Sequence, residues 1–351
     1  MIDDLAPLGP SKLSEVIEIG MEAQDASELD NLPSSARAFF ESCEAVPDWV
    51  DLATFSPGTR MFYRNSKLVL GAMVGGTLVE GFSTNIAKSF FITGRLRDQG
   101  VRRLKQNNRH MVEIFLPYGL DRQGDGWKLS VRVRLVHAMV RRLLYKSDDW
   151  DVEAWGTPIS AAHVGFAITA FSARLLRHLK SLGAKFNEEE RAAFMAVWRY
   201  SGYLMGIPET ILFQDEESAL ELFRVGGLCE PPPDYESISL ANALVHSAPL
   251  IAGVTDTIGR RHLASYVFRV SRALIGPTLA DELKYPRYPT IGVLWWFRMQ
   301  NRYDDFMNKL FKSRVRNNNR MTALLDVSIF DEEGITYRMP DHVYAEESTR
   351  W

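Results

Sequence analysis

Apolar residues recur at intervals of three and four along most of the chain from Phe62 onward, which is the spacing of one helix face. Alternation with period two is scarce and indicates only a small hairpin over 324–339. The chain is therefore predicted to be all-α. The predicted helices are 66–80, 83–93, 98–115, 127–146, 160–182, 187–205, 216–224, 236–248, 257–274, 278–284, 289–299 and 301–315.

Four prolines interrupt the first 50 residues, which predicts short helical patches there. We expect an N-terminal extension over 1–50, a single helical domain over 51–330, and an irregular or hairpin C-terminal tail over 331–351. With 351 residues, of which 46% are hydrophobic, the chain is long enough to bury a sizeable core.

Several local signals place helix ends and contacts. Gly183 is predicted to end one helix, and Asn187 with Glu190 is predicted to begin the next as a capping box. The glycine-rich run 71–76 follows no predicted strand, so it indicates a close helix–helix contact and not a dinucleotide-binding loop. Ahead of the helix over 160–182, Pro158 is placed near the first turn, with Thr157 or Ser160 as the cap.

The predicted helix over 127–146 carries a histidine, His137, on its apolar face. Arg134 and Arg141 lie seven residues apart at the edge of that face. A haem requires this combination, because the iron binds a neutral nitrogen, the porphyrin contacts apolar walls, and the propionates pair with arginines. The apolar stripe that His137 joins consists of Leu129, Val133, Val136, Val140 and Leu144.

A simpler interpretation stands beside this one. A lone histidine on an apolar helix face is more often a hydrogen-bonded core residue than a metal ligand. Arginines flanking such a face are the ordinary edge of an amphipathic helix. The pattern alone leaves both interpretations open.

The preceding predicted helix has a polar stripe, because Arg103, Asn107, His110 and Ile114 fall on one face. A polar stripe on a helix that also buries apolar residues indicates a cavity wall, and a solvated helix side is the alternative. His178 lies on the apolar side of its own helix, where we expect a structural role.

Composition and missing motifs exclude several functions. The net charge of −3 argues against nucleic acid as the main partner. The acidic N-terminus does not resemble a signal peptide, and the longest apolar stretch, 68–79, is too short to span a bilayer, so we expect a soluble cytoplasmic protein. Cys43 and Cys229 fit no zinc or CxxC pattern, and the chain contains no P-loop, GxSxG or HExxH motif.

A set of short segments between Phe62 and Pro208 resembles the family of bacterial rubber oxygenases known as latex clearing proteins. The family includes the fungal, endoplasmic-reticulum-bound oxygenases that cleave a farnesyl chain in mycophenolic acid biosynthesis. The order and spacing of the segments carry the resemblance. They are Thr93-Gly-Arg-Leu96, Arg103-Leu104, Gly126-Trp127, Val133-Arg-Leu-Val-His-Ala-Met-Val-Arg141, Trp155-Gly-Thr-Pro158, Phe171-Ser172, and Trp198-Arg199 with Gly206.

The resemblance implies a globin-like core that holds haem b, with His137 as the proximal iron ligand and Arg103 as the counterpart of the family's arginine at the head of the preceding helix. The distal lysine and threonine of the rubber oxygenases would fall on Gln106 and Asn107. Glutamine cannot replace lysine as a strong iron ligand. This departure puts rubber as the substrate in doubt and leaves the sixth iron position open, water-filled or approached by His110.

The leading hypothesis is a haem b-dependent oxygenase that joins dioxygen to a small, apolar, unsaturated or isoprenoid-like molecule. Arg103, with Asn107 or His110, would stabilise the charge that develops on dioxygen, and Arg134 and Arg141 would bind the propionates. One alternative is a haem sensor or carrier without turnover, in which a side chain such as His110 saturates the iron. Another is a helical lipid-binding module, and the oligomeric state stays open in every case.

Overall fold

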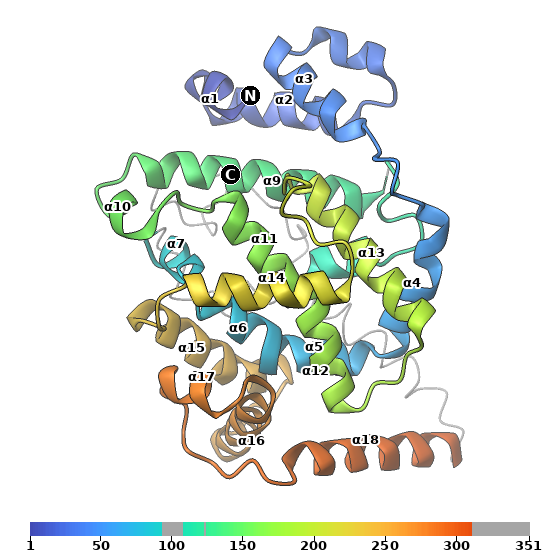
Figure 1. The fold of residues 1–351 in the computed structure, drawn as a ribbon, viewed down its shortest axis with the longest axis vertical. Coiled ribbons are helices and arrows are strands. Elements are labelled where there is room, and N and C mark those ends of the chain that lie inside the picture. Colours follow the sequence, from blue (N-terminus) through green and yellow to red (C-terminus); the bar gives the residue numbers. More distant parts are fainter. Residues whose placement is uncertain (93–107, 123, 311–351) are drawn as a thin grey trace.

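The computed structural model describes residues 1–92, 108–122 and 124–310, and every regular element in this part is helical (Figure 1). The predicted all-α class is confirmed, while the finer expectation of a globin-like arrangement stays a prediction. Residues 108–114 are also helical. The α-helices are α1 (Ile2–Leu5), α2 (Pro10–Glu22), α3 (Ser34–Glu44), α4 (Ser56–Arg64), α5 (Ser66–Ala72), α6 (Leu78–Phe82), α7 (Ile86–Ile92), α9 (Asp125–Tyr145), α10 (Val152–Trp155), α11 (Ala161–Thr169), α12 (Leu175–Leu182), α13 (Glu188–Leu204), α14 (Glu216–Cys229), α15 (Tyr235–Ile251), α16 (Thr257–Ile275), α17 (Pro277–Glu282) and α18 (Val293–Leu310).

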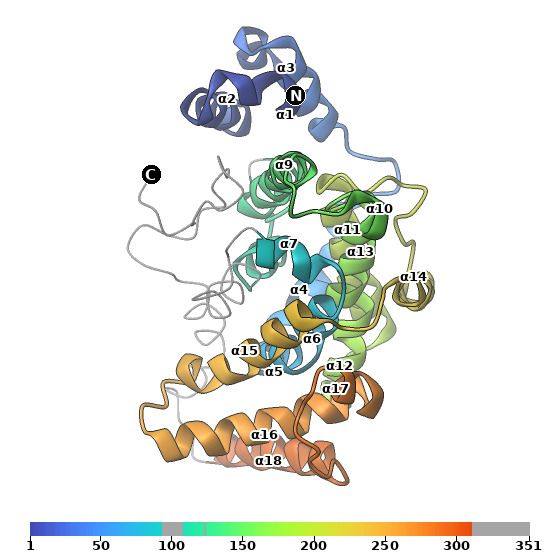
Figure 2. The same ribbon diagram turned by 90° about the vertical axis from the view of Figure 1, so that its left-hand side faces the viewer.

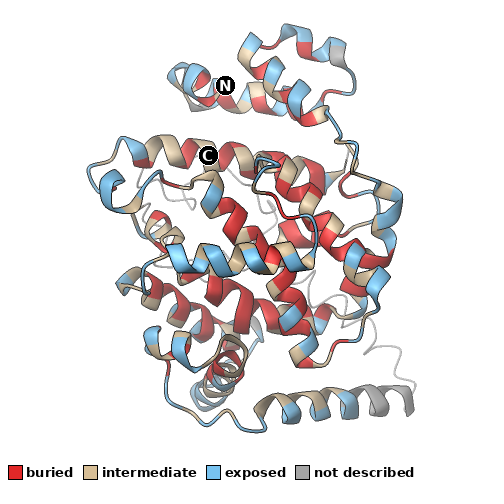
Figure 3. Cartoon of the chain, in the orientation of Figure 1, coloured by how far each residue is buried: buried red, intermediate tan, exposed pale blue. Residues whose placement is uncertain are grey.

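The helices are stacked along the long axis of the molecule. Helices α1–α3 lie at one end beyond α9, and α16–α18 lie at the other (Figures 1 and 2). Between them, buried residues line the inward faces of α9, α11 and α13, whereas α14 lies outside and presents a largely exposed face (Figure 3). The core sits in this middle layer.

Close approach of two helices in the core depends on a glycine. A Cβ atom on Gly58 of α4 would lie 2.6 Å from the backbone nitrogen of Phe194 in α13. No real Cβ contact is that short, so α4 and α13 pack at this distance because position 58 has no side chain. The same reason applies to the predicted contact at 71–76, where a Cβ on Gly76 would lie 2.5 Å from the His178 ring.

Two predicted helices are each interrupted by one wide π-helical turn. Met73–Thr77 separates α5 from α6, and Ala170–Arg174 separates α11 from α12. The two turns contact each other. The predictions of helices over 66–80 and 160–182 identified continuous helical segments, but the 3.6-residue period did not reveal the extra residue in each turn.

The buried carboxylate of Glu80 lies next to these turns. Arg174 donates two hydrogen bonds to it, and the Nε2 atom of His178 lies 3.1 Å from its Oε2. Burial works to raise the pKa of Glu80, but the neighbouring His178 and Arg174 overcome it and hold the pKa below its usual value. His178 is therefore a buried polar residue with a partner, which agrees with its predicted structural role.

The predicted caps are confirmed, and one helix boundary is wrong. Asn187 and Glu190 form a capping box, and Gly183 ends α12 in the left-handed conformation. Ser160 caps α11, so Pro158 lies before the cap and not in the first turn. The two helices predicted over 289–299 and 301–315 are one helix, α18, as far as residue 310, because no proline or glycine separates them.

The N-terminal segment, predicted as an extension, is built from packed helices with Leu13 and Phe40 fully buried. Arg122 attaches it to the rest of the chain. Its guanidinium donates hydrogen bonds to the carbonyls of Gly20, Met21 and Ala23 at the end of α2, and it lies 4.2 Å from the ring centre of Trp127. The last carbonyls of a helix have no partner within the helix, so this arginine satisfies them.

Two further predictions concern membranes and the C-terminal tail. Among the helices of the described ranges, none is both long and apolar enough to cross a bilayer. The predicted hairpin over 324–339 and the predicted tail over 331–351 lie outside the described residues.

Replacing Glu80 with alanine is expected to lower the free energy of unfolding by about 3 kcal/mol, because it leaves the partly buried cation of Arg174 and the buried ring of His178 without their partner. Urea unfolding at neutral pH measures the change. Glu15→Gln, at an exposed site on α2, is the control and should shift stability by less than about 0.5 kcal/mol. A Glu80→Ala loss as small as that of the control would contradict the structural role of this carboxylate.

Candidate functional site: an apolar cavity with three histidines

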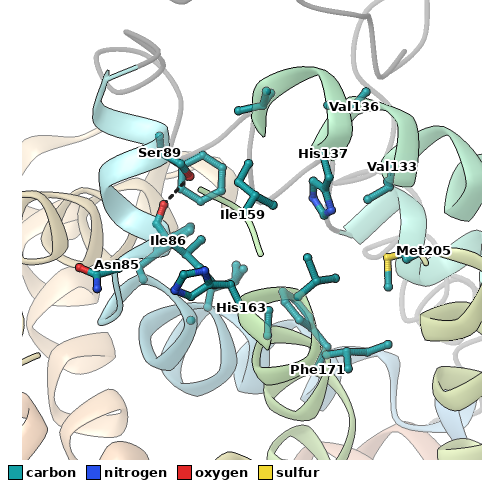
Figure 4. Close-up of a pocket in the computed structure, with 18 of the residues that line it drawn as sticks. Asn85, Ile86, Ser89, Val133, Val136, His137, Ile159, His163, Phe171 and Met205 are labelled. Atoms are coloured by element: carbon teal, nitrogen blue, oxygen red, sulfur yellow. Dashed lines mark hydrogen bonds between the residues drawn. The ribbon is translucent and has the colours of Figure 1, made fainter. Parts of the chain in front are cut away.

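Helices α6, α7, α9 and α11, with parts of α13, surround one cavity in the middle layer (Figure 4). It encloses about 1400 Å³ of space free of protein atoms, part of which is open to solvent. Most of its lining is apolar, and three histidines interrupt this lining: His110, His137 and His163. A concave, mainly apolar site with a few polar groups is the usual form of a small-molecule site.

His137 enters the cavity from α9. Val133, Val136 and Val140 of the predicted stripe line the same cavity, so this face of the helix is the one that meets it. Figure 4 shows the imidazole of His137 directed into the open space. The sequence pattern placed this side chain on an inward face, and the structure adds that the face borders a cavity and not filled core.

His110 reaches the cavity from the helical residues 108–114. Its Nε2 atom lies 2.9 Å from Oγ of Ser130 and 3.4 Å from Oγ of Ser201. Because the Ser130 hydroxyl donates its own proton to the carbonyl of Gly126, Nε2 of His110 must be the donor in the shorter bond. Burial lowers the pKa of His110 to about 4, so the imidazole is neutral at neutral pH.

Other predicted site residues lie outside the described ranges. Arg103, Gln106 and Asn107 are among them, so their predicted roles stay predictions. Of the predicted polar stripe, the structure describes His110 and Ile114, and both are buried. This burial agrees with the cavity-wall interpretation of that helix and not with a solvated side.

The two arginines predicted to bind propionates point elsewhere. Arg134 contacts the N-terminal segment, with its guanidinium 3.7 Å from Sγ of Cys43 and 5.1 Å from the ring centre of Phe39. Arg141 donates hydrogen bonds to the carbonyls of Pro158 and Ile159. Neither arginine lines the cavity. Their placement gives no support to the predicted propionate role.

Arg141 has a positioning role that the sequence did not reveal. Ile159 has a positive φ of 43°, which is an unfavourable conformation for a β-branched residue, and its side chain lines the cavity. The hydrogen bonds from Arg141 hold the carbonyls of this turn in place. The arginine therefore shapes one wall of the cavity from behind.

The sequence analysis gave no role to His163, the third histidine of the cavity. It lies in the first turn of α11, where Nδ1 is 2.9 Å from Oγ of the capping residue Ser160. Its Nε2 atom lies 3.5 Å from the carboxylate of Glu230. The signal available in the sequence was its spacing of four and eight residues from Ala167 and Phe171, which line the cavity too.

The donor set agrees with a haem. A haem iron needs one axial side chain, for which a neutral imidazole is the commonest choice, and apolar walls for its ring. The cavity supplies an inward imidazole from His137 between Val133 and Val140, together with aliphatic side chains from α11 and the ring of Phe171 in the π-helical turn that follows. Among the described residues, no three His, Cys, Asp or Glu side chains gather as they would around a metal ion held by protein ligands alone.

These features define the class of protein: an all-helical chain built around an apolar cavity that an inward histidine enters. The particular family follows from sequence. Residues 60–302 match the family described as the ER-bound oxygenase mpaB/B'/Rubber oxygenase, catalytic domain. The chain belongs to this family, which confirms the resemblance, and the match extends well beyond the segments between Phe62 and Pro208.

Individual relatives are more distant. The Rubber oxygenase of Streptomyces sp. (strain K30) is 24% identical over 186 residues, which are 51% of this chain and 44% of that protein. The aligned stretch thus spans less than half the length of this relative. A solved structure described as latex clearing protein LCP in the closed state superposes with a TM-score of 0.74 at 19% identity, covering 97% of this chain and 91% of that one. At this identity the similarity shows a shared fold.

His110 predicts a pH dependence of stability. Its pKa is about 4 when folded and about 6.5 when unfolded, so the unfolded chain binds the proton first as the pH falls. Wild-type protein is expected to lose about 3 kcal/mol of unfolding free energy from this group between pH 6.5 and pH 4. His110→Gln keeps a donor for Ser130 but lacks the titration, so its decline over this range should be smaller by that amount.

Urea unfolding at several pH values measures the free energy of unfolding of each protein. Both proteins contain the same carboxylates, so the contribution of these groups cancels when the two profiles are subtracted. His262→Gln, at an exposed position on α16, is the control and should keep the wild-type profile. Parallel wild-type and His110→Gln profiles would show that His110 is not held neutral by burial.

Proposed function

We propose that this protein is a haem b-dependent oxygenase that uses dioxygen to oxidise a small, apolar, isoprenoid-like molecule, and that His137 would hold the haem iron. The observation that carries the proposal is the imidazole of His137 directed into an apolar cavity, in a chain that belongs to an oxygenase family. When bound, the haem would supply the iron that reacts with dioxygen.

The chain's own residues would bind the group and exclude water. His137 would hold the iron, and Val133 and Val140, on either side of it, would contact the ring face. The aliphatic and aromatic walls from α7 and α11 would hold the substrate and keep water away from the reacting atoms. Apolar walls favour a substrate with little polar surface, because a buried polar group without a partner is costly.

His110 is a neutral donor in a buried position at the same cavity, held by Ser130. We propose that it keeps its wall of the cavity neutral. The roles expected of Arg103 and Asn107 with dioxygen, and of Gln106 beside the haem, belong to the proposal on the strength of the family resemblance alone. The departure at Gln106 and Asn107 favours a small substrate over rubber.

The alternative of a haem sensor requires a second side chain on the iron, for which His110 is the predicted candidate. Its Nε2 atom donates to Ser130 at 2.9 Å, and binding iron through that atom would break this buried hydrogen bond. This engagement disfavours His110 as a second iron ligand, and so it favours the oxygenase over the sensor. The lipid-binding alternative differs in predicting a colourless protein.

His137→Ala is expected to lower the haem content of the purified protein about ten-fold or more, since loss of even an outer partner of a metal ligand costs ten- to a hundred-fold in affinity. The Soret absorbance and a pyridine haemochrome assay measure haem per protein. His163→Gln, in the same cavity but on the opposite wall, is the matched control and should keep its haem.

A wild-type protein that carries no haem when expressed with an ample supply, or a His137→Ala variant with an unchanged Soret band, would refute the proposal. A ferrous wild-type protein that does not bind carbon monoxide would instead favour the sensor. Haem binding with open coordination, followed by oxygen uptake on adding an unsaturated isoprenoid, is the result we expect.

A further inference from the structure

Helix α18 lies at the end of the molecule opposite α1–α3, and it carries apolar side chains on two faces (Figures 1 and 2). The inner face is covered, because Leu294 and Phe297 pack against the core and the helix contacts α12 and α16. On the outer face, Trp295, Met299 and Tyr303 follow one another at a spacing of four residues, and all three are exposed. The second apolar face is therefore open to solvent.

Two further exposed residues extend this outer face. Trp296 follows Trp295 on the helix, and Ile291 precedes the helix with 97% of its surface exposed. The two indoles are 57% and 55% exposed. Large aromatic side chains are usually well covered, and a continuous exposed apolar patch commonly marks a surface that binds something. We call Ile291, Trp295, Trp296, Met299 and Tyr303 the aromatic surface.

The aromatic surface has positively charged surroundings, although the whole chain carries a net charge of −3. Between residues 256 and 303, the exposed charged side chains are six cations and two anions. The cations are Arg260, Arg261, Arg269, Lys284, Arg287 and Arg302, and the anions are Asp256 and Glu282. In sequence, residues 304–320 contain five more cations and two acidic residues. As far as residue 303, this end of the molecule thus presents a positive potential.

We propose that the aromatic surface binds the surface of a lipid bilayer that contains anionic headgroups. Tryptophan and tyrosine favour the boundary between headgroups and acyl chains, because their rings are apolar and their N–H or O–H groups still reach polar partners. An excess of arginine and lysine beside them adds attraction to negative lipids. This inference goes beyond the proposed function and does not depend on haem.

A second copy of this chain fits the aromatic surface less well. In a symmetric dimer the same patch of both copies meets itself, so the two sets of cations would face each other. Like charges brought together across an interface oppose binding. A bilayer of neutral lipids also fits less well, since it leaves the cations without a counter-charge. The charge around the surface therefore favours an anionic bilayer.

The test uses the full-length protein as purified and two kinds of vesicle: phosphatidylcholine alone, and a mixture of about three parts phosphatidylcholine to one part phosphatidylserine. Co-sedimentation measures the partition coefficient of the protein. Wild type should bind the mixed vesicles at least about ten-fold more strongly at low salt, and high salt should reduce this difference.

Trp295→Ala/Trp296→Ala is expected to weaken binding to the mixed vesicles about ten-fold or more, because two large apolar side chains no longer leave water. Tyr145→Ala/Tyr235→Ala removes two exposed aromatic rings from α9 and α15. It is the matched control and should bind as wild type does.

A second pair of variants tests the charge. Arg287→Gln/Arg302→Gln keeps the aromatic surface and should weaken binding to the mixed vesicles about ten-fold at low salt. Arg60→Gln/Lys146→Gln removes two exposed cations elsewhere and should leave binding unchanged. This arm decides the matter if the tryptophan variant loses its fold, which circular dichroism would reveal.

Wild-type protein that does not sediment with the mixed vesicles, or that sediments equally with both kinds, would overturn the proposal. So would a folded tryptophan variant that binds as wild type does. A wild-type dimer that Trp295→Ala/Trp296→Ala converts to a monomer in sedimentation velocity would assign the aromatic surface to a second copy and overturn the proposal too. None of these results depends on the haem content, so this inference and the proposed function can fail separately.

Discussion

The rotational setting of α9 about its own axis is the constraint on which the site depends. His137 points into the cavity because polar contacts made by other residues of α9 fix how this helix is turned about its axis. At its start, the Ser130 hydroxyl lies between His110 and Ser201. Near its end, Arg141 donates to the carbonyl of Ile159. A turn of the helix by one residue would break both contacts and move the imidazole by about 100°.

The middle layer contains both a buried carboxylate and a cavity. Each of these features by itself lowers the stability of a protein, so their combination is unusual. One helix, α6, contributes to both features. Its residues Leu78 and Phe82 line the cavity, while Glu80, between them, contacts Arg174 and His178. The adjoining π-helical turns change the phase of the helices that carry them. We infer that the ionic contacts fix the walls of a cavity that apolar packing alone would let collapse.

The sequence by itself determined what depends on neighbours along the chain: the all-α class, most of the helices, the caps at Gly183 and Asn187, and the inward face that carries His137. Periodicity encodes which face of a helix is buried but not what that face meets. Only the tertiary structure decided that the face of α9 borders a cavity, that Arg134 and Arg141 turn away from it, and that His163 lies beside Glu230. These contacts join residues far apart in sequence, and they form only when whole helices pack, so no local pattern specifies them.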